Sequence, residues 1–128
     1  MALPQRYRGE VMVVEDDFAI RETLRELLEE EGYRVTQASN GAEALARLRE
    51  AKTPKLILLD LMMPVMDGWE FRHAIEGDPR LADIPVIVIS ADHGLDQKID
   101  AMHVEGYLAK PFELERLLET VERYTEAR

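Results

Sequence analysis

The chain has 128 residues, of which 46% are hydrophobic and 33% are charged, so it is long enough to bury the core of one globular domain. Its net charge of −10 argues against direct binding to the phosphate backbone of a nucleic acid, and the absence of cysteine excludes disulfides and thiolate metal sites. No apolar run approaches the roughly 20 residues that cross a bilayer, and the first residues lack the apolar segment of a secretory signal. We therefore expect a cytoplasmic protein without membrane insertion.

The first predicted strand and helix are joined by acidic residues. Residues 10–15 form a short apolar run that predicts a buried strand, and Asp16 and Asp17 follow it directly. From Phe18 the apolar residues take a helical spacing, with charged residues on the opposite face. Either aspartate can cap this helix, and Gly32 ends it.

A weaker strand and a second helix come next in the chain. Residues 34–38 are less apolar than the first run, so they predict a strand at an edge of the sheet. Asn40, with Glu43 three residues later, is an N-terminal capping pattern for a helix that stops near Pro54. The positions of this helix expected to face the core are Ala44, Leu45 and Leu48.

The central stretch, residues 55–68, reads KLILLDLMMPVMDG. Its four consecutive apolar residues lack polar alternation, which is typical of a strand buried on both faces of a parallel sheet. The run ends on Asp60, Pro64 prevents further ladder pairing, and Asp67 with Gly68 indicates a turn. In open parallel sheets, ligands bind beyond the carboxyl ends of the strands, so Asp60 is placed where chemistry is expected.

The last part of the chain alternates in the same way. A helix around Phe71 and Ile75 is closed by a turn at residues 77–79, and residues 86–90 predict a fourth buried strand. A weakly amphipathic helix over 92–103 and a short strand over 106–109 follow. The final helix spans 113–126, and we expect it to bury Leu114, Leu117, Leu118 and Val121.

Five strands that alternate with five helices predict a doubly wound α/β domain, with a parallel sheet covered by helices on both faces. Two strand orders suit five strands. We favour 2-1-3-4-5, because it places the ends of the first and third strands side by side at the switch point. The domain is expected to span residues 10–128, after a flexible lead-in over the polar residues 1–9.

With that order, five polar residues follow strands at the same edge of the sheet: Asp16, Asp17, Asp60, Ser90 and Lys110. Three close carboxylates repel one another, and a divalent cation such as Mg²⁺ removes that conflict. The lysine and the serine can both donate to a phosphate, and an acid beside a metal can become an aspartyl phosphate. Each residue alone has a plainer explanation as a helix cap, a turn residue or a solvated side chain. Their joint occurrence favours a site.

The chain resembles the receiver domain of two-component response regulators, the CheY-like family, in the segments VVEDDFAIRETL, LILLDLMMPVMDGWEF, VIVISAD and GYLAKPF. The resemblance extends over residues 11–124 with the motifs in order. It implies that Asp60 is the phosphoacceptor of a signalling switch, supplied by a phosphohistidine on a sensor histidine kinase or a histidine phosphotransfer protein. It also implies that Asp16 and Asp17 hold Mg²⁺ beside Asp60, with the backbone carbonyl of Met62 as a further ligand.

The resemblance implies roles for the later motifs as well. Lys110 pairs with the phosphoryl group, and the Lys110–Pro111 bond is cis. Ser90 moves toward the phosphoryl group, and Tyr107 changes rotamer with it. The surface formed by the fourth helix, fifth strand and fifth helix is then expected to change and to bind a downstream protein.

Three alternative functions compete with this interpretation. A phosphohydrolase with an aspartyl nucleophile usually has a second acid two residues later, where this chain has Met62, and a pseudo-receiver would have lost site residues. A flavodoxin-like FMN protein would have a phosphate loop after Val14, which is not found. The residues favour a switch that is not an enzyme acting on another substrate. The sequence does not fix the cognate kinase, the downstream partner, homodimer formation, or the effects of Met62, Asp92 and His103.

Overall fold

The structure, a computed structural model, describes residues 8–50, 53–61, 65–90 and 104–126. Five strands form one parallel sheet in the order β2-β1-β3-β4-β5. The strands are β1 (Gly9–Val14), β2 (Tyr33–Ala38), β3 (Leu56–Asp60), β4 (Val86–Ser90) and β5 (Gly106–Ala109). This confirms the predicted strand order and the position of the second strand at an edge.

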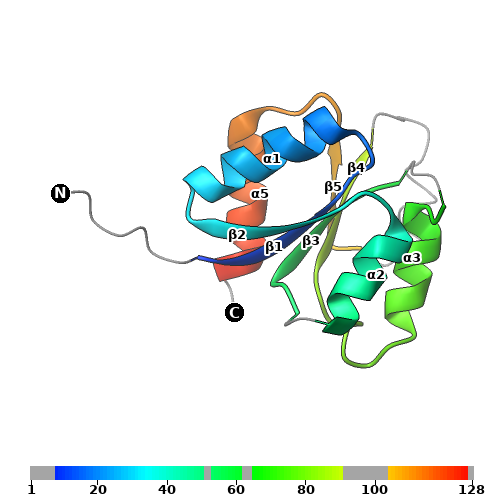
Figure 1. Cartoon of the computed structure of the whole chain (residues 1–128). Coiled ribbons are helices and arrows are strands. Elements are labelled where there is room, and N and C mark those ends of the chain that lie inside the picture. The colour runs from blue at the N-terminus through cyan, green and yellow to red at the C-terminus, as the bar shows by residue number, and fades with distance from the viewer. Residues whose placement is uncertain (1–7, 51–52, 62–64, 91–103, 127–128) are drawn as a thin grey trace.

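Helices cover both faces of the sheet, as predicted. The described helices are α1 (Phe18–Glu30), α2 (Gly41–Glu50), α3 (Gly68–Glu76) and α5 (Leu114–Glu126). In Figure 1, α1 and α5 lie on one face and α2 and α3 on the other. The helix expected over 92–103 and the start of the lead-in lie outside the described residues. Within the described part, no helix combines the length and the apolarity needed to span a membrane.

The strands feed two separate cores because alternate side chains of a strand point to opposite faces. Val11 and Val13 of β1 pack on the α1 and α5 side, together with Leu24, Leu28, Leu56, Leu58, Leu117 and Val121. Met12 and Val14 pack on the α2 and α3 side, together with Leu45, Leu48, Ile57, Leu59, Phe71 and Ile75. Both faces of the central strands are therefore dry, which explains their unbroken apolar sequences.

The buried stripe of α5 differs from the prediction at Leu114. Leu117 and Val121 are fully buried and Leu118 is half-buried, but Leu114 is 46% exposed. Leu114 is the first residue of the helix, and Phe112, which precedes the helix, packs against the core instead. The helical spacing identified the correct face but not the turn at which packing begins.

Two helix caps hold loops at the carboxyl edge of the sheet. The Oδ1 atom of Asn40 accepts a 2.9 Å hydrogen bond from the Glu43 N–H, which confirms the predicted capping pattern. At the start of α3, Asp67 and Glu70 form a reciprocal capping box, with hydrogen bonds of 2.9 and 3.2 Å. The predicted turn at Asp67 and Gly68 is therefore the beginning of a helix.

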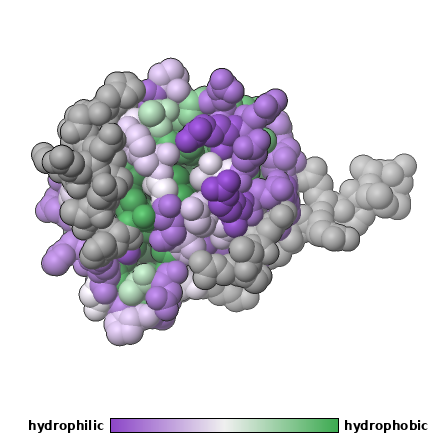
Figure 2. Space-filling model, turned by 180° about the vertical axis from the view of Figure 1, so that it is seen from behind, coloured by the Kyte–Doolittle hydropathy of each residue, from purple (hydrophilic) through white to green (hydrophobic). Residues whose placement is uncertain are grey.

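Polar side chains dominate the outer faces of the helices. Among the described residues, the large hydrophobic side chains that are exposed are Phe18, Val65 and Leu114. Figure 2, which shows the molecule from behind, has strongly hydrophilic residues crowded on one side and a narrower hydrophobic band near the middle. The fold thus presents a mainly polar surface in the described part of the chain.

Candidate functional site

The candidate site lies where β1, β3 and β5 end. Val14 of β1 pairs with Leu59 of β3, so the next residues along the two strands, Glu15 and Asp60, are neighbours across the sheet. Side-chain alternation places both on the face that α1 and α5 cover, since Val13 and Leu58 pack there. The fold therefore places two acids from neighbouring strands beside each other at the carboxyl edge.

Lys110, which follows β5, contacts both of these acids. Its Nζ atom lies 2.7 Å from Oε1 of Glu15 and 3.9 Å from Oδ1 of Asp60. The lysine side chain is 19% exposed, and those of Glu15 and Asp60 are 3% and 7% exposed. The structure thus brings together Asp60 and Lys110, two residues that the sequence analysis placed in the site.

The acids form a cluster that suits a divalent cation. Glu15, Asp16 and Asp60 each offer one carboxylate oxygen, and these oxygens lie within 4.8 Å of one another. Glu15 and Asp60 are buried, whereas Asp16 is exposed, so the cluster opens to solvent on the Asp16 side. Three carboxylates facing one ammonium leave two excess negative charges when all are ionised, and Mg²⁺ prefers such oxygen ligands.

Asp17 is not part of this cluster, which corrects the expected pairing of Asp16 with Asp17. Its Oδ1 atom accepts a 3.0 Å hydrogen bond from the Ile20 N–H and caps α1. Because β1 ends at Val14, the next residue, Glu15, takes the position beside Asp60, while Asp17 already begins the helix. Strand register combined with side-chain alternation is the signal that would have identified Glu15 from the sequence.

The environment of Glu15 keeps its carboxyl group ionised. Burial alone would raise the pKa of Glu15. Hydrogen bonds that involve Asp60, Lys110 and the Asp17 N–H, together with the charge of Lys110, outweigh burial, so that the pKa of Glu15 lies below its ordinary value. In the absence of a metal ion, Lys110 is therefore the counterion of Glu15.

Ser90 and Tyr107 lie on the other side of the sheet edge. Ser90 is fully buried at the end of β4, and its carbonyl oxygen accepts hydrogen bonds from the Lys110 N–H at 2.9 Å and the Tyr107 hydroxyl at 3.4 Å. Tyr107 is half-buried and packs against Leu61 and Val88. The carbonyl of Ser90 therefore connects the side chain of Tyr107 with the backbone of Lys110.

The remaining expectations concern the Lys110–Pro111 bond and the residues Met62, Asp92 and His103. The Lys110–Pro111 peptide bond is cis, as the resemblance implied. Met62, Asp92 and His103 lie outside the described residues, so the structure does not place the expected carbonyl ligand.

Gly68 holds the end of β3 against the start of α3. Its N–H donates a 3.1 Å hydrogen bond to the Leu61 carbonyl. A Cβ atom at this position would lie 2.8 Å from the Leu61 Cα and 2.9 Å from the Asp60 carbonyl oxygen. The close approach of the Gly68 backbone to the backbone of Asp60 and Leu61 therefore requires glycine at this position.

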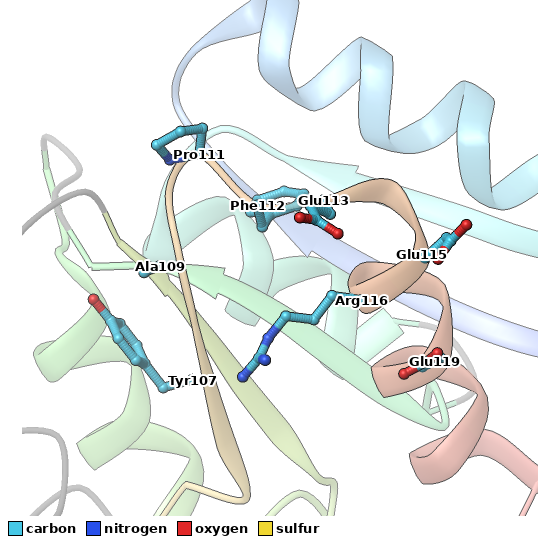
Figure 3. Close-up of a pocket in the computed structure, with 8 residues that line it drawn as sticks. All are labelled: Tyr107, Ala109, Pro111, Phe112, Glu113, Glu115, Arg116 and Glu119. Carbon is cyan, nitrogen blue, oxygen red and sulfur yellow. The ribbon is translucent and has the colours of Figure 1, made fainter.

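A pocket of about 570 Å³ lies beside the site, between β5 and α5. Figure 3 shows Tyr107 on one side of it and three residues of α5 on the other, with Arg116 extending from the helix toward β5. The helix contributes Glu115, Arg116 and Glu119. The pocket borders Tyr107 but not Asp60, so it is separate from the acidic cluster.

Comparisons with known proteins agree with this geometry. The model of the response regulator receiver domain matches residues 11–122. The polar-differentiation response regulator DivK of Brucella anthropi is 36% identical over 116 residues, which make up 89% of this chain and 94% of DivK. The chain also matches longer curated relatives, and it spans 46% of their length.

Solved structures show the same fold. The chemotaxis response regulator CheY4 of Vibrio cholerae superposes with a TM-score of 0.83 at 33% identity, covering 91% of this chain and 98% of CheY4. The receiver domain of the sensor histidine kinase PA1611 from Pseudomonas aeruginosa gives a TM-score of 0.84 at 28% identity, covering 92% and 98% of the two chains. The PA1611 crystal structure has a magnesium ion coordinated in its active-site cleft.

Proposed function

Since the chain belongs to the response regulator receiver domain family, we propose that it works as a phosphorylation switch whose acceptor is Asp60. The observation that carries this proposal is the position of Asp60, with Lys110 at 3.9 Å and two further acids clustered beside it. Proteins of this family act in signalling with histidine kinases and downstream targets rather than as metabolic enzymes.

The proposed reaction is a phosphoryl transfer from a phosphohistidine. A carboxylate oxygen of Asp60 forms a bond to phosphorus, the bond between phosphorus and the histidine nitrogen breaks, and that nitrogen keeps the electron pair. The donor is a sensor histidine kinase or a histidine phosphotransfer protein. The ammonium of Lys110 is close enough to offset charge on the transferred group, because it already lies near the acceptor.

The donor set of the cluster fits Mg²⁺. Glu15, Asp16 and Asp60 would hold the ion, which replaces the expected pair of Asp16 and Asp17. The carbonyl of Met62 stays a proposed further ligand, on the resemblance alone. A bound Mg²⁺ would offset negative charge on the phosphoryl oxygens.

Lys110 has two alternative anionic partners in this scheme. It now contacts Glu15 more closely than Asp60, at 2.7 Å against 3.9 Å. If Glu15 held a cation, the attraction between its carboxylate and the Lys110 ammonium would weaken. Lys110 would then be able to move toward the phosphoryl group that Asp60 would carry.

The proposed output runs from Ser90 through Tyr107 to the β5–α5 surface. The hydroxyl of Tyr107 already contacts the main chain of Ser90, and the same ring lines the pocket beside α5. A rotation of Tyr107 would therefore change the shape of that pocket, where a downstream protein would bind. A packed aromatic ring with two rotamers is a discrete element of the kind that switching requires.

The experiment that tests this function uses acetyl phosphate as the phosphoryl donor, because no particular kinase is needed. Intact-mass spectrometry should show a gain of one phosphoryl group with Mg²⁺ and none with excess chelator. Asp60→Asn should abolish the gain. Asp67→Asn is the matched control and should keep it, because asparagine is also a good N-cap. A wild-type protein that gains no mass under these conditions would overturn the proposal.

A further inference from the structure

Arg21 occupies an unusual position at the start of α1. It is the fourth residue of the helix, and its N–H donates the first helical hydrogen bond, to the Asp17 carbonyl, at 2.9 Å. The N-terminal end of a helix carries a partial positive charge, so a cation there is unfavourable. The first turn of α1 contains no acidic residue, although the carboxylate of the N-cap residue Asp17 lies at the same end of the helix. The contacts of the Arg21 side chain show what else holds the arginine there.

The side chain of Arg21 folds back over the loop between β1 and α1. Side chains on a helix lean toward its N-terminus, which directs this one to the preceding loop. Its Nη1 atom lies 2.7 Å from the carbonyl oxygen of Glu15 and 3.5 Å from that of Asp16. The guanidinium also lies over the Phe18 ring, 5.4 Å from the centroid.

The carbonyl that Arg21 binds belongs to the peptide unit joining Glu15 to Asp16. Fixing this oxygen fixes the rotation of the peptide plane, and with it the directions in which the two acidic side chains leave the backbone. Further hydrogen bonds hold the same loop: the Glu15 N–H donates to Ala38, and the Asp17 N–H donates to Oε2 of Glu15. Arg21 adds a long side chain from the body of α1 to these local contacts.

From this geometry we propose that Arg21 is a positioning residue, which holds Glu15 and Asp16 in the orientation that binds Mg²⁺. The inference rests on the proposed function. Groups that orient metal ligands from outside typically contribute ten- to a hundred-fold to metal affinity.

The charge of Arg21 and its proposed role in orienting the two acids predict opposite effects of its removal on Mg²⁺ affinity. This difference makes the proposal testable. Arg21 is a cation close to a metal site, so charge alone predicts that its neutralisation strengthens Mg²⁺ binding. Orientation predicts that Arg21→Met, which removes the donors but keeps an apolar stem, weakens Mg²⁺ binding about tenfold. Arg21→Lys keeps a charge and one donor group but loses the planar fork, so its affinity should lie between those of wild type and Arg21→Met.

The test measures Mg²⁺ affinity by isothermal titration calorimetry, with circular dichroism as a check of folding. Arg25→Met is the matched control, because Arg25 lies one turn further along α1 and pairs with Glu22 and Glu29 rather than with the loop. It should bind Mg²⁺ as tightly as wild type or slightly more tightly. At saturating Mg²⁺, Arg21→Met should regain most of its rate with acetyl phosphate.

The outcomes separate this inference from the proposed function. If wild type binds Mg²⁺ and Arg21→Met binds it equally well or more tightly, the positioning role is wrong and the proposed function stands. If Arg21→Met does not fold, Arg21→Lys decides, and an affinity equal to that of wild type overturns the role. A wild-type protein that binds no Mg²⁺ overturns both.

Discussion

The ammonium of Lys110 donates a 2.7 Å hydrogen bond to Oε1 of Glu15, although the two residues are 95 positions apart in the chain. Glu15 follows β1 and Lys110 follows β5, so the contact spans the ends of β3 and β4. Asp60, at the end of β3, lies beside this pair. The candidate acceptor, Asp60, therefore lies beside a carboxylate and an ammonium whose charges already neutralise each other.

The first prediction concerns the stability of the metal-free protein in acid. The pKa of Glu15 is lowered in the folded state, so its carboxylate stabilises the fold at pH values above the unfolded pKa of about 4.3. That stability is lost as the pH falls from there through the lower folded pKa. Urea denaturation below about pH 4.5 should therefore show a shallower pH dependence in Glu15→Gln than in wild type. Glu119→Gln, which removes an exposed carboxylate from α5, should keep the wild-type slope. Equal slopes in all three proteins would show that the pair with Lys110 does not stabilise the fold.

The second prediction separates the two adjacent aspartates. Asp16→Asn should weaken Mg²⁺ binding about tenfold or more and raise the melting temperature of the metal-free protein, because it removes one of three clustered carboxylates. Asp17→Asn should leave the Mg²⁺ affinity nearly unchanged, since asparagine caps a helix as well as aspartate does. Calorimetric titration with Mg²⁺ decides between them. A larger loss of Mg²⁺ affinity in Asp17→Asn than in Asp16→Asn would show instead that Asp17 is a ligand of the ion.

Much of the fold could be predicted from local patterns in the sequence. The unbroken apolar runs of β3 and β4, between segments with helical spacing, identified a parallel sheet. The lower apolarity of β2 placed it at an edge. These properties depend on whether one or both faces of each element are buried. The order of apolar and polar residues in the sequence reflects that burial.

The parts that could not be predicted depend on where one element meets another. Asp16 and Asp17 look alike in the sequence, and only the end of β1 at Val14 shows that Glu15 replaces Asp17 beside Asp60. The exposure of Leu114 depends likewise on where the first turn of α5 meets the sheet. The contacts of Arg21 could not be predicted, because its side chain binds backbone oxygens of a loop, and such contacts require no particular residue type in the partner.

The third prediction tests the close packing between β3 and α3. Gly68→Ala would place a Cβ atom within 3 Å of two backbone atoms, so it should destabilise the fold by about 1 to 3 kcal/mol. It should also slow phosphorylation, because the Asp60 carbonyl is one of these atoms. Gly77→Ala is the matched control, since the nearest atom would lie 3.7 Å away and φ is −78°. It should be neutral or stabilising by up to about 1 kcal/mol. Thermal unfolding of both variants measures the difference, and equal effects would contradict the packing argument.

The fourth prediction concerns the connection between Ser90 and Tyr107. Beryllofluoride with Mg²⁺ mimics a phosphoryl group, and it should shift amide NMR signals in β5 and in the first turns of α5. Ser90→Ala should reduce these shifts, because the proposed relay begins at its hydroxyl. Thr23→Ala removes a hydroxyl from the exposed face of α1 and should respond as wild type does. Shifts of the same size in wild type and Ser90→Ala would exclude the relay.

The central claim is that Asp60 carries the phosphoryl group, and mapping the modified residue tests it most directly. After incubation with acetyl phosphate and Mg²⁺, borohydride reduction converts an aspartyl phosphate to homoserine, which peptide mass spectrometry can locate. The account predicts homoserine in place of Asp60, at no other acid, and only when Mg²⁺ is present. Homoserine in place of Asp16 or Asp17, or an unmodified Asp60 in protein that has gained the phosphoryl mass, would contradict it.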